Sequence, residues 1–152
     1  MAAELQILGR AVKQAQYRQH RALDSALGAV GTTLAQWDAL RAISRRPGAS
    51  ARELAVATFQ SEQAFGTLAG RLVAQGQVER RPGRGRRIEH HLTSAGEETL
   101  QAGHRVADEV LGECFEPLTT GERETLLELL HRIGGEGIAE DVRRSEESHT
   151  GH

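Results

Sequence analysis

Cysteine is almost absent from this sequence. Cys114 stands alone among 152 residues, which excludes an intrachain disulfide and is typical of proteins in the reducing cytoplasm. Apolar runs of roughly 18 to 20 residues, the length that spans a bilayer, are also missing. The first ten residues lack the basic and apolar segments of a secretion signal. We therefore expect a cytoplasmic protein that does not enter the membrane.

The chain lacks an overall positive charge, since its formal net charge is −2. This balance excludes a generally polycationic nucleic-acid binder, so any affinity for nucleic acid has to come from a local patch. The length and the hydrophobic share of 38% are those of one soluble domain with a real core.

Apolar residues recur at helical spacing along most of the chain, which predicts a mainly α-helical protein. Several helix starts carry the capping-box pattern, a serine or threonine followed three residues later by glutamate. This pattern occurs at Ser50, Ser94 and Thr119. The expected helices cover about residues 4–30, 34–45, 50–57, 61–75, 94–115 and 119–133.

The periodicity changes after Gly76. The segments "QVERR" and "RRIEHHL" alternate with a period of two, and the "PGRG" between them supplies the proline and glycines of a tight turn. This pattern predicts a β-hairpin. Two compact helices followed directly by a basic hairpin form a winged helix-turn-helix. The predicted fold is therefore mainly α with a small β-hairpin wing.

The hairpin concentrates five arginines around two glycines and a proline. A phosphate-binding loop does not fit, because its glycines would have to lead into a helix rather than a strand. A disordered linker or a plain solvated charge run remains as an alternative to a DNA-contacting wing. In a wing, Arg84, Arg86 and Arg87 are best placed for the minor groove. Arg80 and Arg81 at the strand base are phosphate contacts or exposed charges without a role.

The helix before the hairpin is the expected reader of bases in the major groove. Its glutamine and threonine can bond base edges, and its small residues allow a close approach. It carries Arg71 as its one basic residue, so backbone affinity has to come from the wing and from Arg52. Ordinary surface polarity is the alternative for Gln63 and Thr67. The expected reading residues are Ser61, Glu62, Gln63, Ala64, Gly66, Thr67 and Arg71.

Three segments resemble the MarR family of bacterial transcription regulators: "TLAQWDALRAISRRPGASARELA", "SEQAFGTLAGRLVAQGQVERRP" and "HLTSAGEETL". The resemblance implies a homodimer joined by residues 1–30 and 94–135, a DNA-binding domain at residues 31–93 and a flexible tail at 136–152. It also implies a palindromic double-stranded operator and a repressor released by a small ligand or an oxidant. The wing departs from the family pattern because it is shorter and lacks the usual Asp-x-Arg. The family's minor-groove arginine falls on Arg86 or Arg87.

The family resemblance also implies a ligand site between the dimerisation helices and the DNA-binding lobe, for a phenolic or other aromatic molecule. For Trp37 a core position is the alternative, and for the two histidines a buried or interfacial one. We expect Cys114 to pack on the apolar side of its helix, since flanking glutamates argue against a reactive thiol. The residues expected to line the ligand site are Tyr17, His20, Arg21, Trp37 and His104.

Catalytic and metal-binding patterns are missing. His90 and His91 are adjacent on a strand, so their side chains point to opposite faces and do not share a metal. No nucleophile, base or carboxylate pair suggests an enzyme, and no cofactor is expected. The sequence thus predicts a dimeric, DNA-binding transcriptional regulator. The alternative is a winged-helix module that binds an acidic protein partner without reading DNA.

Overall fold

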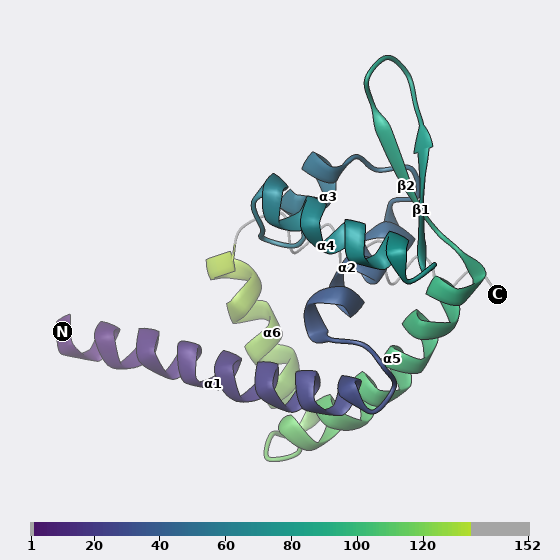
Figure 1. Cartoon of the computed structure of the whole chain (residues 1–152). Coiled ribbons are helices and arrows are strands. Elements are labelled where there is room, and N and C mark those ends of the chain that lie inside the picture. Colours follow the sequence, from purple (N-terminus) through teal and green to yellow (C-terminus); the bar gives the residue numbers. More distant parts are fainter. Residues whose placement is uncertain (1, 135–152) are drawn as a thin grey trace. The chain divides into compact units, whose positions relative to one another are not determined.

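The computed structural model describes residues 2–134, so the expected flexible tail at 136–152 lies outside the described residues. Within this part the chain is mostly helical with one antiparallel hairpin (Figure 1). The predicted fold class is confirmed. The elements are α1 Ala2–Gly28, α2 Leu34–Arg45, α3 Ala51–Ala57, α4 Glu62–Ala74, β1 Val78–Pro82, β2 Ile88–Leu92, α5 Ser94–Cys114 and α6 Thr120–Gly134.

The chain divides into two compact units, residues 1–112 and 113–152. The first holds α1 to α4, the hairpin and nearly all of α5, and the second holds α6. None of the helices within residues 2–134 is long and apolar enough to span a membrane.

Local hydrogen bonds explain where the helices begin. The Ser50 and Ser61 hydroxyls each accept an amide hydrogen bond at the first turn of α3 and α4. At α6 the capping box is reciprocal, since the Thr119 amide donates to Glu122 while the Glu122 amide donates to the Thr119 hydroxyl. Such caps contribute about 1 kcal/mol each.

The predicted cap at Ser94 is wrong by one residue. Ser94 is the first residue of α5, and the hydroxyl of Thr93 accepts from the Gly96 amide at 3.1 Å. The Thr93 hydroxyl also donates to the carbonyl of Gly76 at 2.6 Å. Only Ser94 has a glutamate three residues later, but the neighbouring Thr93 also carries a hydroxyl, and its second contact with Gly76, just after α4, selects Thr93.

The core of the first unit lies where α2, α3 and α4 pack against the hairpin and the ends of α1 and α5. Trp37 is 3% exposed, which confirms its core position, and its indole N–H donates to the Leu100 carbonyl at 3.3 Å. The largest fully buried side chains are Phe65, Leu27, Leu40, Ile43, Leu54, Leu72, Leu100 and His90.

A glycine on α5 makes the Trp37 site possible. A Cβ atom added at Gly103 would overlap the indole ring at Cδ1 and Nε1. We expect Gly103→Ala to lower the free energy of unfolding by about 1–3 kcal/mol through overpacking. Gly112, on the same helix, has open space around it, so Gly112→Ala should raise stability by up to about 1 kcal/mol. Urea denaturation of both variants checks this contrast, and equal changes would contradict it.

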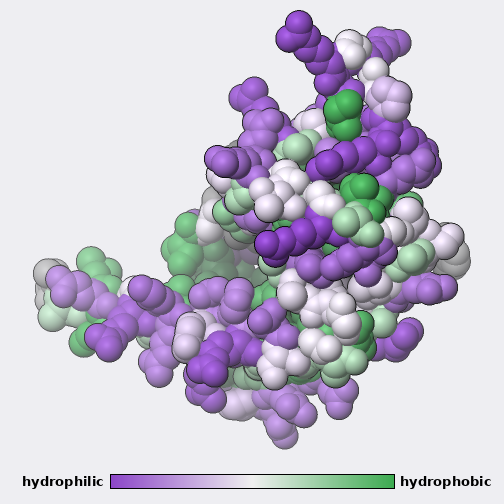
Figure 2. All heavy atoms as spheres, viewed as in Figure 1, coloured by the Kyte–Doolittle hydropathy of each residue, from purple (hydrophilic) through white to green (hydrophobic). Residues whose placement is uncertain are grey.

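Other apolar residues are left exposed by the described part of the chain. Leu5, Ile7 and Leu8 of α1 are at least 59% exposed, and Figure 2 shows apolar side chains toward the N-terminal end of that helix. On α6, Leu129 and Ile133 of the predicted stripe are exposed.

The expectation that Cys114 is packed is wrong for the single chain, because the core along α5 reaches only to Leu111 and Cys114 is exposed.

Candidate nucleic-acid interface

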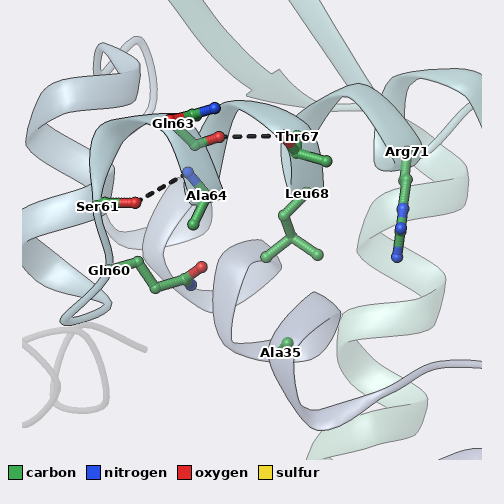
Figure 3. Close-up of a pocket in the computed structure, with 8 residues that line it drawn as sticks. All are labelled: Ala35, Gln60, Ser61, Gln63, Ala64, Thr67, Leu68 and Arg71. Atoms are coloured by element: carbon green, nitrogen blue, oxygen red, sulfur yellow. Dashed lines mark hydrogen bonds between the residues drawn. The ribbon is translucent and has the colours of Figure 1, made fainter.

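Helix α4 presents a polar surface opposite its buried side. Phe65, Ala69 and Leu72 face the core, which turns the residues between them outward. Of the predicted reading residues, all are exposed except Gly66, which is half-buried. The Thr67 hydroxyl donates to the Gln63 backbone carbonyl at 3.2 Å (Figure 3), so the Gln63 side-chain amide remains available for an outside partner.

Two glycines leave the outer face of α4 without a side chain at two positions. Gly66 and Gly70 are four residues apart and therefore share a face with Gln63. A Cβ atom at either glycine would meet nothing within 4 Å, so packing inside the chain does not require glycine there. Glycine inside a helix costs about 1 kcal/mol relative to alanine. The backbone of α4 can therefore be approached closely from outside at these two positions, of which sequence reasoning named Gly66 but not Gly70.

The hairpin is a two-stranded ribbon that projects beyond α3 and α4 (Figure 1). Its strands pair from Val78 opposite Leu92 to Pro82 opposite Ile88. The loop closes with a hydrogen bond from the Arg87 amide to the Arg84 carbonyl, and Gly85 takes the positive φ of 62° that this turn requires. At the other edge, Ala49 forms a bridge with His90, which joins the wing to the start of α3.

The hairpin arginines fall into two groups. Arg80 donates to the Gly66 carbonyl of α4 at 3.2 Å, and Arg81 pairs with Glu79 at 3.0 Å. Arg84 and Arg86 at the loop are exposed and have no side-chain partner among residues 2–134. Figure 2 shows hydrophilic side chains gathered at this end of the hairpin. The loop therefore carries two positive charges that no neighbour in the described chain neutralises.

Arg87, expected among the minor-groove candidates, is bound within the chain. Its guanidinium donates to the Glu53 carboxylate at 2.6 and 3.3 Å and to the Gly48 carbonyl at 3.1 Å. The hydrogen bond from Arg87 is the main cause that lowers the pKa of Glu53, and Glu53 in turn raises the pKa of Arg87. Arg87 thus ties the wing to the first turn of α3, while Arg52 of the same turn has no described side-chain partner.

His90 fills the junction between the wing and α4. It is 2% exposed, and its ring meets Phe65 edge-on with centroids 6.2 Å apart. Its Nδ1 lies 3.0 Å from the Ala49 carbonyl, which only accepts, so Nδ1 carries the proton. Nε2 is buried and has no hydrogen-bond partner among the described residues. Burial is the main cause that lowers the pKa of His90, against the opposing effect of the Ala49 carbonyl.

This lowered pKa predicts a loss of stability in mild acid. The unfolded chain takes up a proton at His90 below about pH 6.5, whereas the folded chain resists it, so the stability present at pH 7 falls as the pH drops through that value. His104, whose pKa burial also lowers, contributes with the same sign. Urea denaturation between pH 5.5 and 8 should show this slope, which His90→Gln reduces. An unchanged slope in the His90→Gln, His104→Gln double variant would contradict the assignment.

A pocket of about 460 Å³ opens between α4 and the start of α2 (Figure 3). Ala35 of α2 forms one wall, and Leu68 gives the floor an apolar side chain. Arg71 stands at one end, exposed and without a described side-chain partner. The pocket is lined by Ala35, Gln60, Ser61, Gln63, Ala64, Thr67, Leu68 and Arg71, so it shares several residues with the predicted reading surface.

The predicted ligand-site residues form two separate sets. Trp37 and His104 lie together, with ring centroids 5.5 Å apart, and the Arg41 guanidinium stacks 4.6 Å from the Trp37 centroid. Tyr17 and Arg21 instead pair with each other on the exposed surface of α1.

His20 is exposed on α1 rather than buried. Burial raises the pKa of Asp38 on α2, and the nearby Arg41 and, more weakly, His20 oppose this rise. Sequence reasoning missed Asp38 and Arg41. Asp38 follows Trp37 directly and Arg41 lies one helical turn after it, and this proximity was the available signal.

Within residues 2–134, no group of three or more histidine, cysteine, aspartate or glutamate side chains could hold a metal ion. His90 and His91 point to different environments, His90 into the core and His91 toward Glu89 at 3.0 Å.

The comparisons with known proteins agree with this geometry. Residues 30–88 match the sequence model of the MarR family. A probable transcriptional regulator from Pseudomonas aeruginosa is 29% identical, with a TM-score of 0.75 over 82% of this chain and 95% of its own. A mutant MarR from E. coli complexed with operator DNA is 26% identical, with a TM-score of 0.80 over 86% and 95%.

A third similar structure is a MarR family protein from Mycobacterium tuberculosis in complex with p-aminosalicylic acid. It is 25% identical, with a TM-score of 0.70 over 84% of this chain and 98% of that one. No curated protein matches the sequence. Residues 30–88 thus match the MarR family, and the chain has the fold of that family's winged helix-turn-helix transcriptional regulators.

Proposed function

We propose that the protein is a homodimeric, sequence-specific double-stranded DNA-binding regulator that represses transcription from a palindromic operator. The observation that carries this proposal is the pairing of an accessible reading helix with a charged wing. Gln63 and Thr67 stand beside the uncovered Gly66 and Gly70, and the unpaired Arg84 and Arg86 lie at the hairpin loop. In this arrangement α4 enters the major groove while the wing reaches the flanking minor groove.

The dimer is supported by the apolar residues left uncovered on α1 and α6. Single scattered apolar side chains are normal on a surface, but several grouped on one helix, such as Leu5, Ile7 and Leu8 of α1, mark an interaction site. We assign residues 1–30 and 94–135 to dimerisation and residues 31–93 to DNA binding. A two-fold dimer places its reading helices one helical turn apart, which accounts for a palindromic operator.

Selection from a random pool of duplexes tests the function directly. We expect an enriched palindrome whose half-sites are about one helical turn apart, bound by a species with the mass of two chains in sedimentation. Gln63→Ala and Thr67→Ala should alter the preferred bases. A pool that yields no enriched sequence would favour the alternative, a module that binds an acidic protein, and a reporter gene under the selected operator distinguishes repression from activation.

We also propose an anionic aromatic effector that binds in the pocket beside α4, with its carboxylate on Arg71. The complex of a family member with p-aminosalicylic acid supports this ligand class, and the pocket offers a cation next to an apolar floor. A ligand there would occupy the space beside Gln63 and Thr67 and so compete with DNA.

Calorimetric titration with p-aminosalicylic acid separates this pocket from the Trp37–His104 site. Arg71→Gln should weaken binding if the carboxylate is on α4, and His104→Gln should leave it unchanged. The reverse pattern would place the effector at the Trp37–His104 site instead.

A further inference from the structure

The turn that joins α3 to α4 contains an unusual phenylalanine. Phe59 has a φ of 57°, and it is the one non-glycine residue with a positive φ among residues 2–134. Its amide donates to the Val56 carbonyl, and the Gln60 amide donates to the Ala55 carbonyl at 2.9 Å. These two bonds define the helix-ending motif in which glycine is strongly preferred. An L-residue in this conformation costs about 1–2 kcal/mol.

Packing within the described part of the chain does not compensate for this conformation. The Phe59 side chain is 85% exposed, and Val56, one helical turn earlier, is 74% exposed. A glycine would relieve the backbone, and a polar residue would suit the solvent. Among residues 2–134 the phenylalanine is therefore unfavourable on both counts, which favours a partner outside the described part of the chain.

The position of Phe59 indicates which partner this is. Phe59 lies two residues before Ser61, the N-cap of α4, at the end of the reading helix that leads into the major groove. Val56 is four residues after Arg52, so both share a face of α3. The apolar pair thus lies between an unpaired arginine on one side and the reading residues on the other, continuous with the proposed DNA surface.

We propose that Phe59, flanked by Val56, reads thymine by packing against the C5-methyl group in the major groove. Phenylalanine is one of the side chains that make this apolar contact, and the methyl group is the feature that distinguishes thymine there. The inference rests on the proposed DNA-binding function and adds a specificity determinant outside α4. It assigns the strained residue to base recognition rather than to a protein partner.

Deoxyuridine substitution tests the contact one methyl group at a time. Each thymine of the selected operator is replaced by uracil, which leaves pairing and charge unchanged. With the wild-type protein, at least one position per half-site should lose about fourfold in affinity, the fold-change that corresponds to one buried methyl group. Phe59→Gly should fold at least as stably, and its affinity should not respond to uracil at that position.

The salt dependence should be the same for wild type and Phe59→Gly, because no phosphate contact is removed. Val56→Ala serves as the neighbouring control and should keep most of the uracil effect. If Phe59→Gly retains the full loss at every thymine, or if the wild type is insensitive to uracil throughout, Phe59 does not read thymine. Failure of the wild type to bind any selected duplex overturns the proposed function itself and is a separate outcome.

Discussion

Gly70→Gln should abolish specific DNA binding while leaving the fold at least as stable as the wild type. A Cβ atom at Gly70 meets nothing within 4 Å, so a side chain can begin there without overlapping its neighbours, and a good helix former in place of glycine adds up to about 1 kcal/mol. On the outer face of α4, however, the glutamine would hold the helix away from the base edges. We expect operator affinity to fall by at least about 100-fold, toward the level of non-specific binding.

Gly70→Ala is the matched control, because it gives the same gain in helix propensity with a single extra methyl group. It should raise the unfolding midpoint and weaken operator binding much less than glutamine does. Thermal unfolding and a gel shift with the selected operator measure the two effects separately. Wild-type affinity in the glutamine variant would mean that this face of α4 does not enter the groove.

The helices were predictable because their signals are local. The Ser50, Ser61 and Thr119 hydroxyls bond amides three residues away, so the sequence window that predicts the cap also contains its partner. The apolar stripes likewise placed the boundaries of α2 without error and those of α1 within two residues. The one cap assigned to the wrong residue, Ser94, failed because Thr93 has a distant partner in the Gly76 carbonyl.

The roles of the arginines were not predictable, because their partners are also distant in the sequence. Arg87 and Glu53 are 34 residues apart, and the fold alone brings them together, so a sequence window shows Arg86 and Arg87 as equivalent charges. The glycines of α4 and α5 illustrate the other limit. Gly103 and Gly70 both read as helix-weakening residues, yet Gly103 makes room for Trp37 and Gly70 faces open space.

Removing the unpaired wing arginines should weaken binding to every DNA sequence and flatten its salt dependence. Each phosphate that an arginine neutralises contributes about 0.9 to the slope of log affinity against log salt concentration. Arg84 and Arg86 are free to make such contacts, so the double variant Arg84→Ala, Arg86→Ala should reduce the slope by about 2. Base preference should stay unchanged, because phosphate contacts carry no sequence information.

Arg87→Ala is the informative comparison, since the Arg87 charge is already neutralised by Glu53. We expect it to lower affinity by loosening the wing on α3 while the salt slope stays close to that of the wild type. Glu53→Gln should act in the opposite direction and steepen the slope, because it releases the Arg87 charge toward the DNA. A slope that falls in Arg87→Ala as far as in Arg86→Ala would show that the Arg87–Glu53 pair opens on binding and that Arg87 contacts phosphate.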